Sequence, residues 1–231
     1  MKKVIHKKSK RMKQASEMVD KSKTYSLAEA SELIKKTSTV KFDAAVDVHL
    51  SLGIDTKKSD QQVRGTVTLP HGNGKTIRIA AVALNADQQK AAKDAGADLV
   101  GEKELVEEIK GGKINFDILV ATPEAMKILT PIAKVLGPKG LMPNPKDGTV
   151  AQNIGEAVAN LKKGKVSFKN DNTGNLHIMI GRASFDAVKL AENIKAVIDA
   201  IQKAKPATAK GSYIKNVSIA SSMGPGIKVS I

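Results

Sequence analysis

Charge divides this chain of 231 residues into three parts, and the division limits the folds that are open to it. Residues 1–68 hold 15 Lys and Arg against 8 Asp and Glu, and residues 161–231 hold 12 against 4. Residues 69–160 hold 11 of each, so the two outer parts carry the whole net charge of +15. Each outer part is short for a core of its own, so we expect one basic domain from 1–68 plus 161–231, with 69–160 inserted.

The middle part has the pattern of a parallel α/β domain. Apolar runs of strand length at 76–84 and 116–121 alternate with helical stretches at 87–95 and 102–110. Strands that alternate with helices form a parallel sheet with helices packed on it. We therefore predict an inserted, Rossmann-like α/β domain.

The outer parts indicate an α+β domain instead. Apolar residues alternate with polar ones from 42 to 52, which predicts a strand with one buried face and one solvated or ligand-facing side. This alternation places Phe42 on the buried face. Runs at 165–169 and 176–180 flank a turn rich in Asn, Asp and Gly, and predict a β-hairpin.

The composition restricts location and chemistry. The chain has no cysteine, which excludes disulfides, zinc–thiolate sites and thiol catalysis and fits a reducing compartment. It has no apolar run of about 18 residues, and its first residues lack the apolar stretch of a secretory signal, so we expect a cytoplasmic protein without a membrane span.

No catalytic, cofactor or metal set emerges from the sequence. The segment 72–76 resembles the end of a phosphate-binding loop, but the glycine required at position 69 is replaced by Leu69 and a strand, not a helix, is expected next. The four histidines lack metal-ligand spacing; folding could join His49 and His177, although ordinary strand residues are the simpler interpretation. We therefore predict a protein that is not an enzyme. The alternative is a hinge-type small-molecule-binding protein or enzyme that uses the cleft between the domains.

The strong positive charge favours a polyanionic partner, and nucleic acid is the commonest one. Candidate phosphate contacts are Lys35, Lys36, Lys41, Lys162, Lys163, Lys165, Lys169 and Lys210. Aromatic residues make up only 3%, so recognition should depend on shape and close backbone approach, which suits folded RNA. The segment 221–226, Ser-Ser-Met-Gly-Pro-Gly, is either such a contact loop or an ordinary turn between strands.

Five of the ten residues from 137 to 146 are Gly or Pro, which predicts a loop of fixed shape. It is either a structural corner or a basic contact loop. Since it lies in the neutral part, we expect a rigid corner with at most a secondary contact through Lys139 and Lys146.

Several segments resemble one known family. Residues 132–145 read Ile-Ala-Lys-Val-Leu-Gly-Pro-Lys-Gly-Leu-Met-Pro-Asn-Pro, 59–66 read Ser-Asp-Gln-Gln-Val-Arg-Gly-Thr, and 222–225 read Ser-Met-Gly-Pro. Together with Lys-Phe-Asp at 41–43 and Phe-Lys-Asn-Asp at 168–171, they resemble the bacterial-type ribosomal protein L-one family, the stalk proteins of the large subunit.

The resemblance implies a structural protein of the large ribosomal subunit, a monomer when free. Its implied partners are large-subunit rRNA, the tRNA at the exit site, other ribosomal components and its own mRNA, whose translation it would repress. It implies RNA contacts at Lys41, Phe42, Asp47, His49, Lys165, Ser167, Lys169, Thr173, His177, Ser222, Met223 and Gly224. Some relatives carry Thr at Ser222, which keeps the hydroxyl, and Lys at Ser51, where this chain lacks the positive charge for a phosphate contact.

Overall fold

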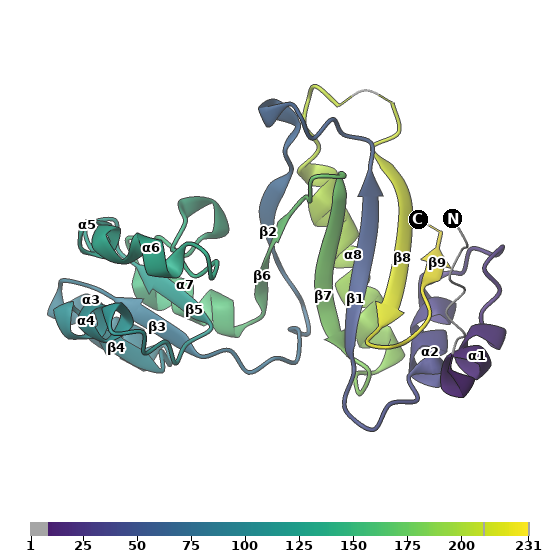
Figure 1. Ribbon diagram of the computed structural model, residues 1–231, viewed down its shortest axis with the longest axis horizontal. Helices are drawn as coiled ribbons and strands as arrows, with labels where there is room; N and C mark the ends of the chain where they lie inside the picture. Colours follow the sequence, from purple (N-terminus) through teal and green to yellow (C-terminus); the bar gives the residue numbers. More distant parts are fainter. Residues whose placement is uncertain (1–8, 210, 231) are drawn as a thin grey trace, which may run out of the picture. The chain divides into compact units, whose positions relative to one another are not determined.

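The computed structural model describes residues 9–209 and 211–230 (Figure 1). It is a mixed α/β structure with several sheets, one of them parallel and three-stranded, which confirms the predicted mixture of α and β structure. Contacts group the chain into two compact units, which we call unit 1 (Met1–Gly74 with Phe168–Ile231) and unit 2 (Lys75–Ser167). The domain limits expected from charge, at 68/69 and 160/161, stay a prediction.

Unit 1 is built on a four-stranded antiparallel sheet. Its strand order is β7-β1-β8-β9. Strand β1 precedes unit 2 in the sequence, and it lies between β7 and β8, which both follow unit 2. The strands are β1 (Ala45–Leu52), β7 (Asn175–Arg182), β8 (Ile214–Ser221) and β9 (Ile227–Val229), and the helices are α1 (Lys10–Glu17), α2 (Leu27–Thr37) and α8 (Ala187–Lys203). Sequence segments from both ends of the chain therefore make one sheet.

Helices cover one face of this sheet. In Figure 1, α8 runs behind the strands, and its buried Leu190, Ile194 and Val197 are spaced to form one apolar face. Helix α2 contacts α8, β8 and β9, and begins at a capping box in which Ser26 and Glu29 satisfy each other's backbone N–H groups. Burial alternates residue by residue along β1, as the sequence predicted, so the opposite face of the sheet carries the polar side chains.

The predicted β-hairpin at 165–180 is wrong. Both runs are strands, but β6 (Lys165–Lys169) pairs with β2 (Arg64–Thr68) in a separate two-stranded sheet, while β7 pairs with β1. The turn itself forms, because the Asp171 carboxylate accepts the backbone N–H of Asn175 at 2.7 Å. Strand β7 then buries its apolar residues in the larger sheet, and the side chain and backbone of Asn170 bond to Val63, next to β2.

Unit 2 contains a parallel sheet in the order β4-β3-β5, buried on both faces. Along β3, Ala80 and Val82 face one apolar cluster, and Ile79 and Ala81 face the other. The strands are β3 (Ile79–Val82), β4 (Leu99–Gly101) and β5 (Ile118–Ala121), and the helices are α3 (Ala86–Asp94), α4 (Lys103–Lys110), α5 (Met126–Leu129), α6 (Ala133–Leu136) and α7 (Ile154–Lys162). This is the strand–helix alternation that the sequence predicted.

The Gly/Pro-rich loop of unit 2 has a hydrogen-bonded corner. The Asn144 side chain accepts the backbone N–H of Lys146 at 2.9 Å. The Thr149 hydroxyl accepts the N–H of Asn144 at 2.8 Å and donates to its carbonyl oxygen at 3.1 Å. Gly148 closes the turn at a φ of 68°, where a side chain would be strained. These bonds favour the corner interpretation, although Lys139 and Lys146 are exposed.

Among the described residues, no helix has the length and apolar character that crossing a bilayer requires.

Candidate nucleic-acid interface

The face of the unit 1 sheet that the helices leave uncovered carries a set of mostly polar side chains. Its central strand, β1, contributes every second residue, and each of these lies opposite a partner on both neighbouring strands. We call this set the open face: Asp47, His49, Ser51, Asn175, His177, Met179, Asn216, Ser218 and Ala220. Its members are exposed or half-buried, whereas the residues between them along β1 are buried.

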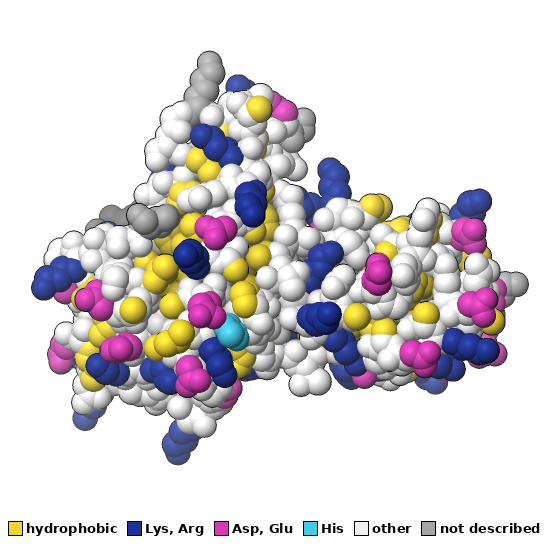
Figure 2. All heavy atoms as spheres, turned by 180° about the vertical axis from the view of Figure 1, so that it is seen from behind, with side chains coloured by type: hydrophobic (Ala, Val, Ile, Leu, Met, Phe, Trp, Pro, Cys, Tyr) yellow, Lys and Arg dark blue, Asp and Glu magenta, His cyan; other side chains and the backbone are white. Residues whose placement is uncertain are grey.

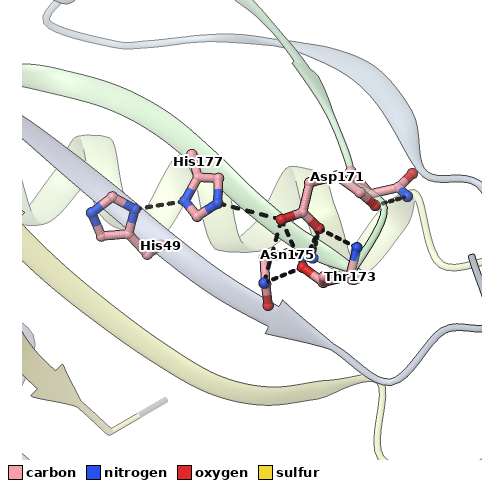
Figure 3. A network of polar contacts seen from close by, with 6 residues as sticks. His49, Asp171, Thr173, Asn175 and His177 are labelled. Atoms are coloured by element: carbon pink, nitrogen blue, oxygen red, sulfur yellow. Dashed lines mark hydrogen bonds and ion pairs between the residues drawn. The ribbon is translucent and has the colours of Figure 1, made fainter. Parts of the chain in front are cut away.

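Two histidines meet at the centre of the open face (Figure 3). His49 and His177 are register partners, and their Nδ1 atoms lie 2.8 Å apart. One ring must donate and the other accept at this distance, so one of the two Nδ1 atoms carries a proton and the other does not, and the accepting ring is neutral. The sequence left open whether these histidines would come together, and the structure joins them.

The environment of the pair disfavours a charged His49. Burial, and then the neighbouring His177, lower the pKa of His49 below its usual value of 6.5, while Asp47 acts in the opposite direction. A neutral ring presents one donor and one acceptor, so it can hydrogen-bond a ribose hydroxyl or a base edge.

A rigid turn borders the histidine pair. The Asp171 carboxylate accepts hydrogen bonds from the backbone N–H groups of Asn175 and Thr173 and from the Thr173 hydroxyl. These hydrogen bonds lower the pKa of Asp171 to about 2, and the bond from the Asn175 backbone has the largest effect. His177 Nε2 lies 3.8 Å from Asp171 Oδ2, so the turn carboxylate also faces the pair. Asp171 thus fixes Thr173, an exposed residue of the predicted RNA-contacting set.

The end of the sheet where β1 begins carries two exposed apolar side chains. The N–H of Ser222 donates to the Ala45 carbonyl at 2.9 Å, which holds the loop after β8 beside the start of β1. Met223 in this loop is 66% exposed, and Phe42 before β1 is 56% exposed. The prediction that alternation buries Phe42 is wrong, because β1 begins at Ala45 and the regular alternation begins with Ala44.

Asp43 anchors the segment that carries Lys41 and Phe42. Its carboxylate accepts the backbone N–H of Ser184 at 3.1 Å and the hydroxyl of the same residue at 2.9 Å. Its carbonyl oxygen accepts a hydrogen bond from Arg182 at 3.0 Å. Asp43 therefore has a structural role, next to the exposed Lys41 and Phe42.

The predicted site residues divide between the units. Ten lie in unit 1: Lys41, Phe42, Asp47, His49, Lys169, Thr173, His177, Ser222, Met223 and Gly224. Lys165, Ser167, Lys139 and Lys146 lie in unit 2, where the first two line a cavity of about 120 Å³ together with Gly140 and Met142. Lys210 lies outside the described residues, as do the lysines of residues 1–8.

Sequence reasoning missed Met179, Asn216 and Ser218, which share the open face with the predicted residues. Alternation along β7 and β8 would place them on a polar face, but only the pairing register shows that it is the face of His49. Within the part of the chain that the structure describes, no group of three or more potential ligands could hold a metal ion.

The two units differ in their net charge, and both contain basic and acidic residues. Unit 1 holds 24 Lys and Arg against 12 Asp and Glu, and unit 2 holds 14 against 11. On the helix-covered side of unit 1, Figure 2 shows basic and acidic side chains interspersed, without a continuous basic area. The open face carries Asp47 as its one acidic residue and has the exposed Lys41 before the start of β1, and we take it as the candidate surface for a polyanion.

Comparison with known proteins gives the family. Residues 34–225 match the model of the Ribosomal protein L1p/L10e family, and the chain belongs to that family. It is 53% identical over 223 residues to "Large ribosomal subunit protein uL1" of Streptococcus thermophilus, covering 96% of this chain and 97% of that protein. The proteins of the same name from Methylobacillus flagellatus and Neisseria meningitidis serogroup C are each 52% identical over 221 residues. The alignments cover 96% of this chain in both cases, and 96% and 95% of those proteins.

Proposed function

We propose that this protein is a structural constituent of the large ribosomal subunit and binds rRNA through the open face of unit 1. The membership of a ribosomal protein family, over 192 residues from 34 to 225, is the observation that carries this proposal. The relatives are named as proteins of the large subunit and not as enzymes. A protein with this role is not an enzyme, and it works on ribosomes in the cytoplasm.

The proposed contacts follow from the chemistry of the open face and its borders. Lys41 and Lys169 are exposed and would neutralise phosphates, which gives affinity without sequence information. Asp47, His49, His177 and Thr173 offer donors and acceptors that suit ribose hydroxyls. The apolar Phe42 and Met223 would pack on a base or ribose at the end of the sheet.

Lys165 and Ser167 are kept in the proposed RNA-contacting set through the family resemblance, together with Ser222 and Gly224. They extend the set along β6 and around the loop after β8. Lys139 and Lys146 are proposed as a secondary contact only, because the corner that carries them belongs to the less charged unit.

We also propose the finer features that the family resemblance implies. Units 1 and 2 would be two domains, one split and basic and the other an inserted Rossmann-like domain. The protein would form the mobile stalk near the exit site for tRNA, contact that tRNA and other ribosomal components, and be a monomer when free. It would also bind its own mRNA through the same open face and repress its translation.

Sequencing the RNA that is bound to the tagged full-length protein in ribosome-depleted lysate tests the proposal. We expect strong enrichment of one segment of large-subunit rRNA, and a weaker enrichment of the protein's own messenger. A matched variant, His177→Ala with Ser218→Ala on the open face, should lose both, whereas Lys134→Ala in unit 2 should keep both. RNA bound without enrichment of any segment would overturn the proposal.

A further inference from the structure

The first described helix, α1, reaches the loop after β8, although 212 positions separate the contacting residues in the sequence. Arg11 on α1 donates from Nη2 to the carbonyl oxygen of Met223 at 2.9 Å. The helix itself is fixed at its start, where the Ser9 hydroxyl accepts the N–H of Met12, and by the burial of Ala15. The charged side chain of Arg11, near the start of the chain, thus hydrogen-bonds the loop after β8, near its end.

Met223 needs such support because its backbone is in a region that side chains disfavour. Its φ of 61° is left-handed, and it is the one described residue other than glycine with a positive φ. Such a conformation places Cβ close to the backbone oxygen and persists where the surroundings hold it. The side chain of Met223 is nevertheless 66% exposed, so burial of the thioether does not hold it.

The neighbours of Met223 are held from other directions. The N–H of Ser222 donates to Ala45, and the N–H of Gly224 donates to Ser221 at 2.8 Å. A Cβ at Gly224 would collide with the Ser221 hydroxyl, so a larger residue there would require the Ser221 side chain to move. These bonds fix the residues on both sides of Met223, and Arg11 fixes the carbonyl oxygen of Met223 itself.

The packing of Arg11 argues against a role as a phosphate ligand. Its Nη1 is fully buried and makes no hydrogen bond to a described residue. In this packing Nη1 cannot reach a phosphate, and Nη2 is already bonded to the carbonyl oxygen of Met223. The exposed Lys13, two residues along the same helix, is a better candidate for a solvent-facing charge.

We infer that Arg11 is a positioning residue that holds the loop of residues 221–224 in the shape in which Met223 faces the RNA. The inference rests on the proposed function, because it assigns the loop to RNA recognition. It gives the N-terminal helix a role in specificity, and it predicts that Arg11 acts on bound RNA only through Met223.

The test compares Arg11→Met with Lys13→Met in the full chain. Both variants remove one positive charge from α1 and place an unbranched apolar side chain in its position. Arg11→Met should weaken binding to the co-purified rRNA segment by up to about tenfold, because the loop loses one hydrogen bond that favours the shape in which Met223 faces the RNA. Binding to a random RNA of the same length should weaken only slightly, and equally in both variants.

NMR of the free protein separates this inference from the proposed function. The Met223 methyl and Gly224 amide signals should shift in Arg11→Met and stay in place in Lys13→Met, and Arg11→Lys should restore them in part. Unchanged Met223 signals in Arg11→Met, or equal losses of specific affinity in both variants, would contradict the inference. If the wild-type protein does not prefer the rRNA segment, the proposed function fails, and the spectra still decide whether Arg11 positions the loop.

Discussion

The sheets of the two units differ in how many of their faces are covered. In unit 1, helices cover one face of an antiparallel sheet, and the other face carries alternate polar side chains such as His49 and His177. In unit 2, the parallel sheet is buried on both faces, with Ala80 facing one core and Ala81 the other. A sheet that is covered twice serves as a scaffold, whereas a sheet that is covered once leaves a rigid surface free for a ligand.

The largest effect should come from breaking each core separately. Leu50→Ala in β1 and Leu119→Ala in β5 both truncate fully buried side chains and should each cost about 2–5 kcal/mol of unfolding free energy. Native-state hydrogen exchange, read by mass spectrometry, should show faster exchange in unit 1 for the first variant and in unit 2 for the second. RNA affinity should fall with Leu50→Ala only. Equal loosening of both units by either variant would show that they are one cooperative structure.

Met223→Ala sharpens the comparison within unit 1. Removal of this exposed thioether should reduce specific rRNA affinity by about tenfold, as expected for one lost apolar contact, and leave the unfolding free energy nearly unchanged. Met18→Ala is the control, since Met18 is also exposed, at 52%, but lies at the end of α1. Filter binding with specific and random RNA measures both. A similar loss for random RNA would mean that Met223 has no part in recognition.

Phosphate contacts should differ between the units in their salt dependence. Lys41→Gln should lower the slope of log affinity against log salt by about 1, because one counterion-releasing contact is lost. Lys134→Gln in unit 2 removes the same charge from an exposed position and should leave the slope unchanged. Titrations at four salt concentrations suffice. An equal change for both lysines would remove the distinction between the units.

The smallest expected effect concerns the histidine pair. Because its folded pKa is below 6.5, His49 favours the fold in its neutral form, so its contribution to stability is lost as pH falls below 6.5 through the folded pKa. NMR titration of the His49 ring should give a midpoint below 6.5, and His177→Gln should raise it by removing the second cause of the shift. A midpoint at or above 6.5 in the wild-type protein would contradict the burial of this ring.

Local patterns in the sequence predicted the types of the strands and helices and their buried faces. They did not predict which strands pair with one another. The alternation from 42 to 52 predicted a strand with one buried and one solvated or ligand-facing side, and the strand–helix alternation predicted the parallel sheet. The hairpin prediction failed because a turn signal specifies the chain reversal but not the partners of the two strands. The bond from Arg11 to Met223 could not be predicted, since no local pattern links residues so far apart.

Hydroxyl-radical footprinting of the full chain, with and without the rRNA segment, tests the central claim most directly. Methionine and histidine oxidise readily, and the open face and its borders carry Met179, His177 and Met223, whereas Met126 lies in unit 2. We predict that RNA protects the three residues of unit 1 and leaves Met126 unchanged. Protection of Met126 without protection of the open face would contradict the account.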